Sequence, residues 1–236
     1  MMNKRGTHLE IVISFVLFIT FLMFLLIITS PLIKKEGKED VFSNKIVIEK
    51  IMEKISANFI VVSISNESYA DSGNANCVKI NNTRIGTNNL LYSIVKDKDG
   101  NIINSSKSGE YLMIEWNSNK TFYKLYYSEE YLKSTQTTNN NCTLAKEGLI
   151  RSKKYVSERR VREAVSNYEA NYNRFKNDLS IPSNIEFSFS FMYSNGTSLS
   201  TKESDVSGGI YVKESKIEYI DDSADINFGS LKVKTW

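Results

Sequence analysis

The pattern of apolar and polar positions separates an apolar N-terminal rod from a longer segment of mixed character. From Ile11 to Ile28 the only polar side chains are Ser14 and Thr20. About twenty apolar residues, each adding about 1.5 Å to a helix, match the ~30 Å hydrocarbon core of a bilayer. The sequence therefore predicts one membrane-spanning helix over residues 9–33.

A second helical period follows this rod. The stretch SPLIKKEGKED, residues 30–40, is polar and contains one glycine, which predicts a short break or a loosened helix. Apolar residues then recur at helical spacing up to the end of the segment, so we expect a juxtamembrane helix or stalk over residues 34–59 that packs one face on a sheet. The residues of this stripe are Ile48, Ile51, Met52, Ile55 and Phe59.

Beyond residue 60 the apolar residues alternate as they do in strands. We expect strands at residues 59–65 and around Cys77, and a hairpin whose turn lies at residues 97–101. A second hairpin is predicted to pair residues 111–116 with residues 122–127. Near the C-terminus, Asn195-Gly196 predicts a type I′ turn after the strand at residues 185–193, and Lys232 and Lys234 favour an exposed edge strand.

One further long helix is predicted within this region. Ser157 is a candidate N-cap, with Val156 and Val161 placed as a hydrophobic staple, and Pro182 ends the helix. The apolar seam lasts under three heptads, which favours packing on the sheet over a coiled coil. Its residues are Val161, Val165, Tyr168, Tyr172, Phe175 and Leu179.

These elements predict an α+β fold. We expect one N-terminal transmembrane helix that continues into a second helical stretch, and then a mainly antiparallel β-sheet domain with one long helix over residues 60–236. Lys and Arg flank the apolar rod on both sides, so their count alone does not set its orientation. The short head, the two cysteines and the Asn-x-Ser/Thr sites favour a cytoplasmic head at residues 1–8 and an extracytoplasmic C-terminal domain in the cell envelope.

Cys77 and Cys142 are the two cysteines of the chain. In an oxidising exterior we expect them to form a disulfide, which would close a loop of about 65 residues and stabilise the fold by roughly 4 kcal/mol in the chain-entropy model. Two free buried thiols are the alternative.

Six asparagines head glycosylation sequons in a chain rich in Asn, Ser and Thr. Chance alone would give four or five, so the number is weak evidence while each site remains a candidate. The six are Asn66, Asn81, Asn104, Asn119, Asn141 and Asn195.

Catalytic and metal chemistry finds little support in the sequence. The one histidine, His8, lies in the N-terminal head, so the C-terminal domain lacks the imidazole of Ser-His-Asp and Cys-His sites. Asp97, Asp99 and Asn101 have the spacing of the first calcium ligands of an EF-hand, but the glycine comes early and Ser108 stands where glutamate is needed. We therefore expect a hairpin turn there, no cofactor and no enzymatic activity.

Charge likewise gives no indication of a nucleic-acid partner, because the chain has a formal net charge of +3. Seven Lys and Arg residues gather between Lys146 and Arg162. A solvated helix end explains them more simply than an acidic partner does.

Glu10 is unusual because a carboxylate is costly inside a bilayer, about 2.5 to 3.5 kcal/mol at the centre. Glu10 at the headgroup level is one explanation. The series Lys4, Arg5, Gly6 and then Glu10, followed by an unbroken apolar helix, also resembles the class III signal of type IV pilins and pilin-like proteins. In that family the glutamate usually lies one position further from the cleavage site, and the residues after it differ from Thr7 and His8.

The resemblance implies that a prepilin peptidase cuts after Gly6 and frees the amine of Thr7. Glu10 would then neutralise the amine of a neighbouring subunit, and Pro31 fits the kinked helices of the family. The expected partners are the lipid bilayer, the peptidase, and copies of this chain or other pilin-like subunits. The function expected is that of a structural or minor subunit of a surface filament. The alternative is a permanently anchored monomeric binding module, an adhesin or a receptor.

Overall fold

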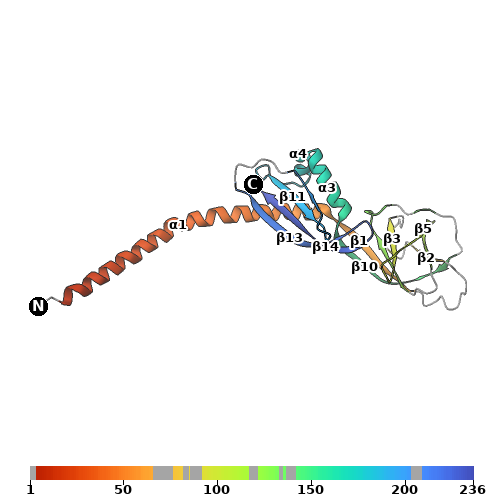
Figure 1. Cartoon of the computed structure of the whole chain (residues 1–236), viewed down its shortest axis with the longest axis horizontal. Helices are drawn as coiled ribbons and strands as arrows, with labels where there is room; N and C mark the ends of the chain where they lie inside the picture. The colour runs from red at the N-terminus through yellow and green to blue at the C-terminus, as the bar shows by residue number, and fades with distance from the viewer. Residues whose placement is uncertain are drawn as a thin grey trace.

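A single helix, α1 (Lys4–Ile55), projects from a β-rich domain and forms the N-terminal part of the molecule (Figure 1). The structure is a computed structural model that describes residues 4–65, 77–81, 85, 92–116, 122–132, 135–136, 142–202 and 209–236. At about 1.5 Å per residue, α1 is about 78 Å long. The long apolar N-terminal helix of the predicted α+β fold is thus present.

The sequence allowed a short break or a loosened helix at residues 30–40, and the break is wrong, because α1 is helical throughout this stretch. Gly37 costs only about 1 kcal/mol relative to alanine, and the lysines and glutamates around it are good helix formers. The helical segments before and after Gly37 stabilise the continuous helix by more than this cost. Figure 1 shows the axis of α1 changing direction near its middle. Pro31 lies near the middle of the helix in the sequence and lacks a backbone donor, which is a common cause of such a bend.

The described strands form two sheets that are mainly antiparallel, as predicted. The larger sheet has the order β12-β11-β14-β13-β10-β1-β7-β3-β4, and the smaller has the order β8-β5-β6-β2-β9. The strands are β1 (Ser56–Ser65), β2 (Cys77–Asn81), β3 (Ser93–Asp97), β4 (Ile102–Ile103), β5 (Ser105–Ser108), β6 (Tyr111–Glu115), β7 (Phe122–Tyr127), β8 (Thr135–Gln136), β9 (Thr143–Leu144), β10 (Lys146–Ser157), β11 (Phe187–Met192), β12 (Ser198–Ser200), β13 (Tyr211–Ile220) and β14 (Ile226–Thr235).

The domain has two lobes, which β1 and β10 connect (Figure 1). The inner lobe, next to the projecting part of α1, contains β11–β14, the end of α1, and helices α3 (Glu158–Ala170) and α4 (Tyr172–Asp178). The outer lobe contains β2–β9. Each lobe has its own apolar core, and a third cluster joins them, made of Ala57, Phe59, Tyr126, Tyr131, Tyr155, Ile220 and Ala224.

The inner core forms where α1, α3 and α4 pack on the sheet. Ile48, Ile51 and Ile55 are buried there, which confirms the predicted stripe on α1. Phe59 does not belong to this stripe, because α1 ends at Ile55 and Phe59 lies on β1, with its ring against those of Tyr131 and Tyr155. The chain passes from α1 into β1 without an intervening loop.

The long helix predicted after Ser157 is interrupted. Ser157 is the N-cap of α3, as predicted, and accepts a hydrogen bond from the backbone N–H of Arg160. Asn171 adopts an extended conformation that ends α3, and its side chain accepts a hydrogen bond from the N–H of Arg174 to begin α4. This local bond competes with a continuous helix. The seam still packs on the sheet, with Val161, Tyr168 and Phe175 buried, as expected.

In the outer lobe the predicted pairing of residues 111–116 with 122–127 is wrong. β6 pairs with β5 and β2 in the smaller sheet, while β7 pairs with β1 and β3 in the larger one. The apolar faces of the two strands meet across the outer core instead, where the rings of Trp116 and Tyr123 lie 4.5 Å apart. Both rings are buried.

Two predictions near the C-terminus also need correction. The β11–β12 turn is not type I′, because Gly196 but not Asn195 has a positive φ, and the Tyr193 carbonyl accepts the N–H of Gly196. β14 is not an edge strand, since it lies between β11 and β13. Lys232 and Lys234 therefore project from a central strand.

Candidate membrane-spanning helix and adjoining groove

The most distinctive surface is the apolar segment of α1 from Glu10 to Ile28. This segment of 19 residues is long and apolar enough to cross a membrane, and none of it is buried against the domain. Large apolar side chains point outwards on every side of the helix. Monomers in water rarely expose contiguous apolar patches beyond a few hundred Å², so this segment is a candidate surface for contact with a membrane or another protein.

The polar groups within the segment fit an apolar medium. The Thr20 hydroxyl donates to the backbone carbonyls of Val16 and Leu17, at 3.0 and 2.9 Å. The helix itself pairs the backbone groups. Glu10 is exposed and lies at the end of the segment rather than at its centre.

The residues that resemble a pilin-like signal belong to the same helix. Lys4, Arg5, Gly6 and Thr7 form the beginning of α1, within two turns of Glu10, and their side chains lie outside the described part of the structure. These residues therefore lie on one helix with Glu10. Cleavage after Gly6 stays a prediction.

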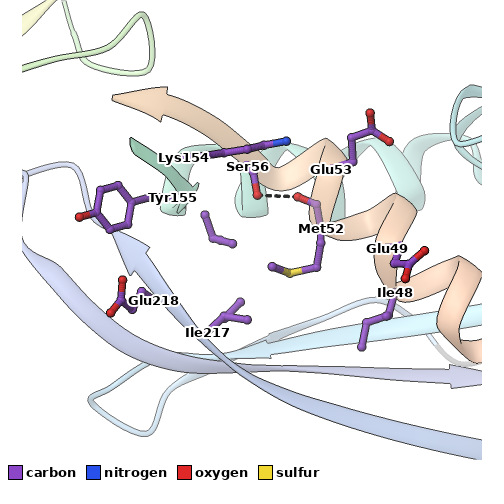
Figure 2. A pocket seen from close by; sticks show the side chains of 10 residues that line it. Ile48, Glu49, Met52, Glu53, Ser56, Lys154, Tyr155, Ile217 and Glu218 are labelled. Carbon is purple, nitrogen blue, oxygen red and sulfur yellow. Dashed lines mark hydrogen bonds between the residues drawn. The ribbon is translucent and has the colours of Figure 1, made fainter. Parts of the chain in front are cut away.

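A groove with a volume of about 610 Å³ lies where α1 enters the domain (Figure 2). β10 and β13 form a parallel pair at only two positions and then separate, and the end of α1 packs beside the gap. Apolar side chains of all three elements line the groove, and carboxylates of α1 and β13 stand at its rim. The apolar side chains are Ile48, Met52, Val156 and Ile217, and the carboxylates are Glu49, Glu53 and Glu218.

Specific polar contacts hold the groove together. The Ser56 hydroxyl donates to the Met52 carbonyl at 2.6 Å, at the end of α1. Lys153, on β10, links this strand to β13. Its Nζ lies 2.7 Å from a carboxylate oxygen of Glu218 on β13 and 4.4 Å from the ring centre of Tyr155 on β10. The hydrogen bond to Glu218 raises the pKa of the Lys153 ammonium.

The carboxylates of the groove are paired with lysines, Glu49 with Lys45, Glu53 with Lys50 and Glu218 with Lys153, and Lys154 also lines it. The apolar side chains are therefore the part of the groove suited to a ligand.

The predicted disulfide is present and joins Cys77, on β2, to Cys142, just before β9. It therefore ties together neighbouring strands of the smaller sheet in the outer lobe. The predicted alternative of two free thiols does not hold in this structure.

The six sequons differ in where they lie. Asn66, Asn119 and Asn141 fall outside the described residues. Asn81 is half-buried at the end of β2, and the amide nitrogen of Asn104 donates to Glu115. Asn195 is exposed at the tip of the β11–β12 hairpin.

In the two acidic turns, aspartate side chains form hydrogen bonds and an ion pair within the protein. Asp97 Oδ1 accepts the backbone N–H groups of Asp99 and Asn101, which confirms the predicted hairpin turn. The β13–β14 turn is built alike, and its Asp225 pairs with Lys96 at 2.6 Å. In the described part of the chain, no group of three or more His, Cys, Asp or Glu residues is placed to hold a metal ion.

The basic stretch from Lys146 to Arg162 is largely paired with carboxylates. Arg159 contacts Glu163, Arg160 contacts Glu130, and Arg162 contacts Glu158 and Asp222. The pairs four residues apart on α3 can be read from the sequence. The groove could not be anticipated, because it combines residues more than one hundred positions apart.

Comparison with protein-family models, curated proteins and solved structures finds no match in any of the three. Functional conclusions therefore rest on the residues of this chain.

Proposed function

We propose that this chain is a membrane-anchored protein of the cell envelope. The observation that carries the proposal is the apolar segment of α1, which is exposed on every side although the same helix continues into a buried core. The segment crosses the bilayer, residues 1–8 lie in the cytoplasm, and both lobes lie outside. The disulfide Cys77–Cys142 supports an oxidising exterior for the lobes.

Within this class we favour a pilin-like subunit of a surface filament or a related assembly. The support comes from the order of features along α1: a basic tip with Gly6, then Glu10, then an apolar segment, then a stripe packed on a sheet. Cleavage after Gly6 would leave a new amine on Thr7, within reach of a carboxylate such as Glu10 on a neighbouring copy. Such pairing would offset the cost of a charge at the membrane.

The direct test is the N-terminal residue of the mature protein. After co-expression with a prepilin peptidase, sequencing should give Thr7 as the first residue. A Gly6→Val variant should retain Met1 or Met2, because the peptidase requires the small residue before the cut in the proposed signal. A wild-type chain that still begins at Met1 or Met2 would refute processing while leaving anchorage intact.

The role of Glu10 separates a subunit from a simple anchor. Glu10→Ala should insert into the membrane normally and fail to assemble, as measured by chemical cross-linking between copies. Glu10→Asp, which keeps the charge, is the matched control and should retain part of the cross-linking. Equal cross-linking in the wild-type and Glu10→Ala chains favours a permanent monomeric anchor.

The groove at the end of α1 favours the second candidate, an anchored binding module such as an adhesin or receptor. Its apolar side chains would take an apolar group. An Ile217→Trp variant should fill the groove and abolish any thermal stabilisation by apolar ligands. Stabilisation that persists in this variant would place the ligand elsewhere.

A further inference from the structure

The sequon at Asn195 has a conformation that sets it apart from the other two described sequons. Asn195, Gly196 and Thr197 form the tip of the hairpin between β11 and β12, and all three residues are exposed. Gly196 has a φ of 82°, and its N–H donates to the carbonyl of Tyr193. The chain therefore reverses its direction within this sequon, which leaves Asn195 on a convex part of the surface.

The side-chain amide of Asn195 is oriented by Thr197. Its Oδ1 accepts the backbone N–H of Thr197 at 2.9 Å and the Thr197 hydroxyl at 2.7 Å. With the oxygen held against Thr197, the amide nitrogen Nδ2 points away from it, and none of the described residues bonds this nitrogen. Nδ2 is thus free to react.

A second contact holds the hairpin in place on the inner lobe. The hydroxyl of Tyr219, on β13, accepts the backbone N–H of Ser194 at 3.4 Å and lies 3.1 Å from the Ser194 hydroxyl. Tyr219 itself is buried. The turn is therefore ordered before any enzyme binds it, which lowers the entropic cost of binding.

The other two described sequons are engaged in the smaller sheet. The amide nitrogen of Asn104 donates to Glu115 at 3.0 Å, and its carbonyl accepts the N–H of Glu115. Ser106, the hydroxyl residue of this sequon, lies between β6 and β8 in the sheet, so the sequon cannot form a turn unless β5 leaves both partners. Asn81 is half-buried and pairs with Tyr111 of β6.

We propose that Asn195 is the attachment site of an N-linked glycan in the folded domain, and that Asn81 and Asn104 are not modified in it. In this reaction Nδ2 forms a bond to C1 of a lipid-linked glycosyl phosphate, the bond from C1 to the phosphate oxygen breaks, the phosphate leaves with the electron pair, and Nδ2 gives up one proton. The inference rests on the proposed function, because N-glycosylation takes place on the outer side of the membrane, where that function places the lobes.

The experiment uses the folded full-length chain in detergent micelles, an oligosaccharyl transferase that accepts the plain Asn-x-Ser/Thr sequon, and a lipid-linked oligosaccharide. Mass spectrometry of the glycopeptides measures the rate of transfer at each site. Short synthetic peptides centred on Asn81, Asn104 and Asn195 are the matched controls, because they lack the fold. Dividing the rate at each folded site by the rate for its peptide removes the preference of the enzyme for the sequence itself.

We expect Asn195 to react in the folded chain nearly as fast as in its peptide. Asn104 should react at least about tenfold more slowly than its peptide, which corresponds to only about 1.4 kcal/mol for freeing the strand. An Asn195→Gln variant should lose the glycopeptide of this site alone. Transfer at Asn81 or Asn104 that equals transfer at Asn195, relative to the peptides, overturns the proposal.

Alkaline extraction of membranes that contain the same full-length chain tests the anchorage separately. A chain that stays in the membrane fraction, but whose Asn195 does not react while its peptide does, overturns the attachment site and leaves the anchorage standing. A chain that is released from the membrane, but is modified at Asn195, overturns the anchorage and leaves the attachment site standing.

Discussion

Two parts of α1 share one backbone geometry and meet opposite environments. Residues 10–28 are apolar on every side and lie outside the domain. Residues 44–55 carry one apolar stripe, with Val47, Ile51 and Ile55 fully buried and Lys45, Glu49 and Glu53 exposed. The surroundings of a helix are thus indicated by how far around it the apolar side chains extend, rather than by helix formation.

The comparison also separates two contributions to function. In the proposed function the first part of α1 anchors the protein, and it adds nothing to the cores of the lobes. The second part is a structural element of the inner lobe and has no apolar face left for lipid. Changes in either part should therefore affect one property and spare the other.

The largest effect should come from charges placed in the apolar part. Leu17→Arg with Phe21→Arg should cost about 5 to 7 kcal/mol of membrane insertion, at about 2.5 to 3.5 kcal/mol for each arginine. The protein should then leave the membrane fraction on alkaline extraction while the lobes keep their thermal midpoint. The conservative pair Leu17→Ile with Phe21→Leu should stay bound. Full membrane retention of the double arginine variant would contradict the spanning role.

The next largest effect concerns the outer lobe, which belongs to neither of the two compared parts of α1. Replacing Cys77 and Cys142 by serine should lower the free energy of unfolding by roughly 4 kcal/mol, because the unfolded chain regains the freedom of a loop that spans 65 positions. Denaturant unfolding with and without a reductant measures this. Reductant should change the wild type alone, and membrane retention should stay unchanged in both chains.

A somewhat smaller effect is expected from the buried part of α1. Ile51→Ala should destabilise the fold by about 3 kcal/mol, within the range of 2 to 5 observed for such truncations of fully buried side chains. The exposed Lys54→Ala is the matched control on the same turn and should change stability by less than about 0.5 kcal/mol. Equal effects of the two variants would mean that this part of α1 does not pack in the core.

The smallest effect is a dependence on pH confined to the inner lobe. Burial acts to raise the pKa of the Glu186 carboxyl, but hydrogen bonds from Lys176 and Tyr172 outweigh it and hold the pKa below its ordinary value. The carboxylate therefore stabilises the fold above the ordinary glutamate pKa of about 4.3, and this stability is lost as the pH falls further. Thermal unfolding of Glu186→Gln should show a weaker acid dependence than the wild type between about pH 5 and pH 3.

Membrane retention should not change over the same pH range, because residues 11–28 contain no titratable side chain. Release of the protein from the membrane at low pH would contradict the separation of membrane anchorage from the stability of the lobes.

Much of the fold followed from periodicity in the sequence. The apolar rod, the stripe on α1, the Ser157 cap and the turn at Asp97 were all predictable, because each depends on neighbours within a few residues. Errors arose where local signals conflicted. A single glycine did not break α1, whereas Asn171, with its side-chain bond to the backbone, did interrupt the second helix.

Long-range arrangement was less accessible. The pairing of β6 and β7 looked local, yet each strand found its partners in a different sheet. The groove at Ile217 depends on where α1 packs against β13, which no local pattern encodes. For the signal residues Lys4, Arg5 and Gly6, processing remains a prediction.

The direct passage of α1 into β1 has a mechanical consequence. Any tension on the anchor passes through the buried end of α1 and reaches β1 at Ser56, whose carbonyl also accepts a hydrogen bond from Arg160. β1 is flanked by β10 and β7, so a pull along its axis loads both ladders of hydrogen bonds in shear, all at once, rather than opening them one by one. This arrangement should make the domain resistant to unfolding by a force applied through α1.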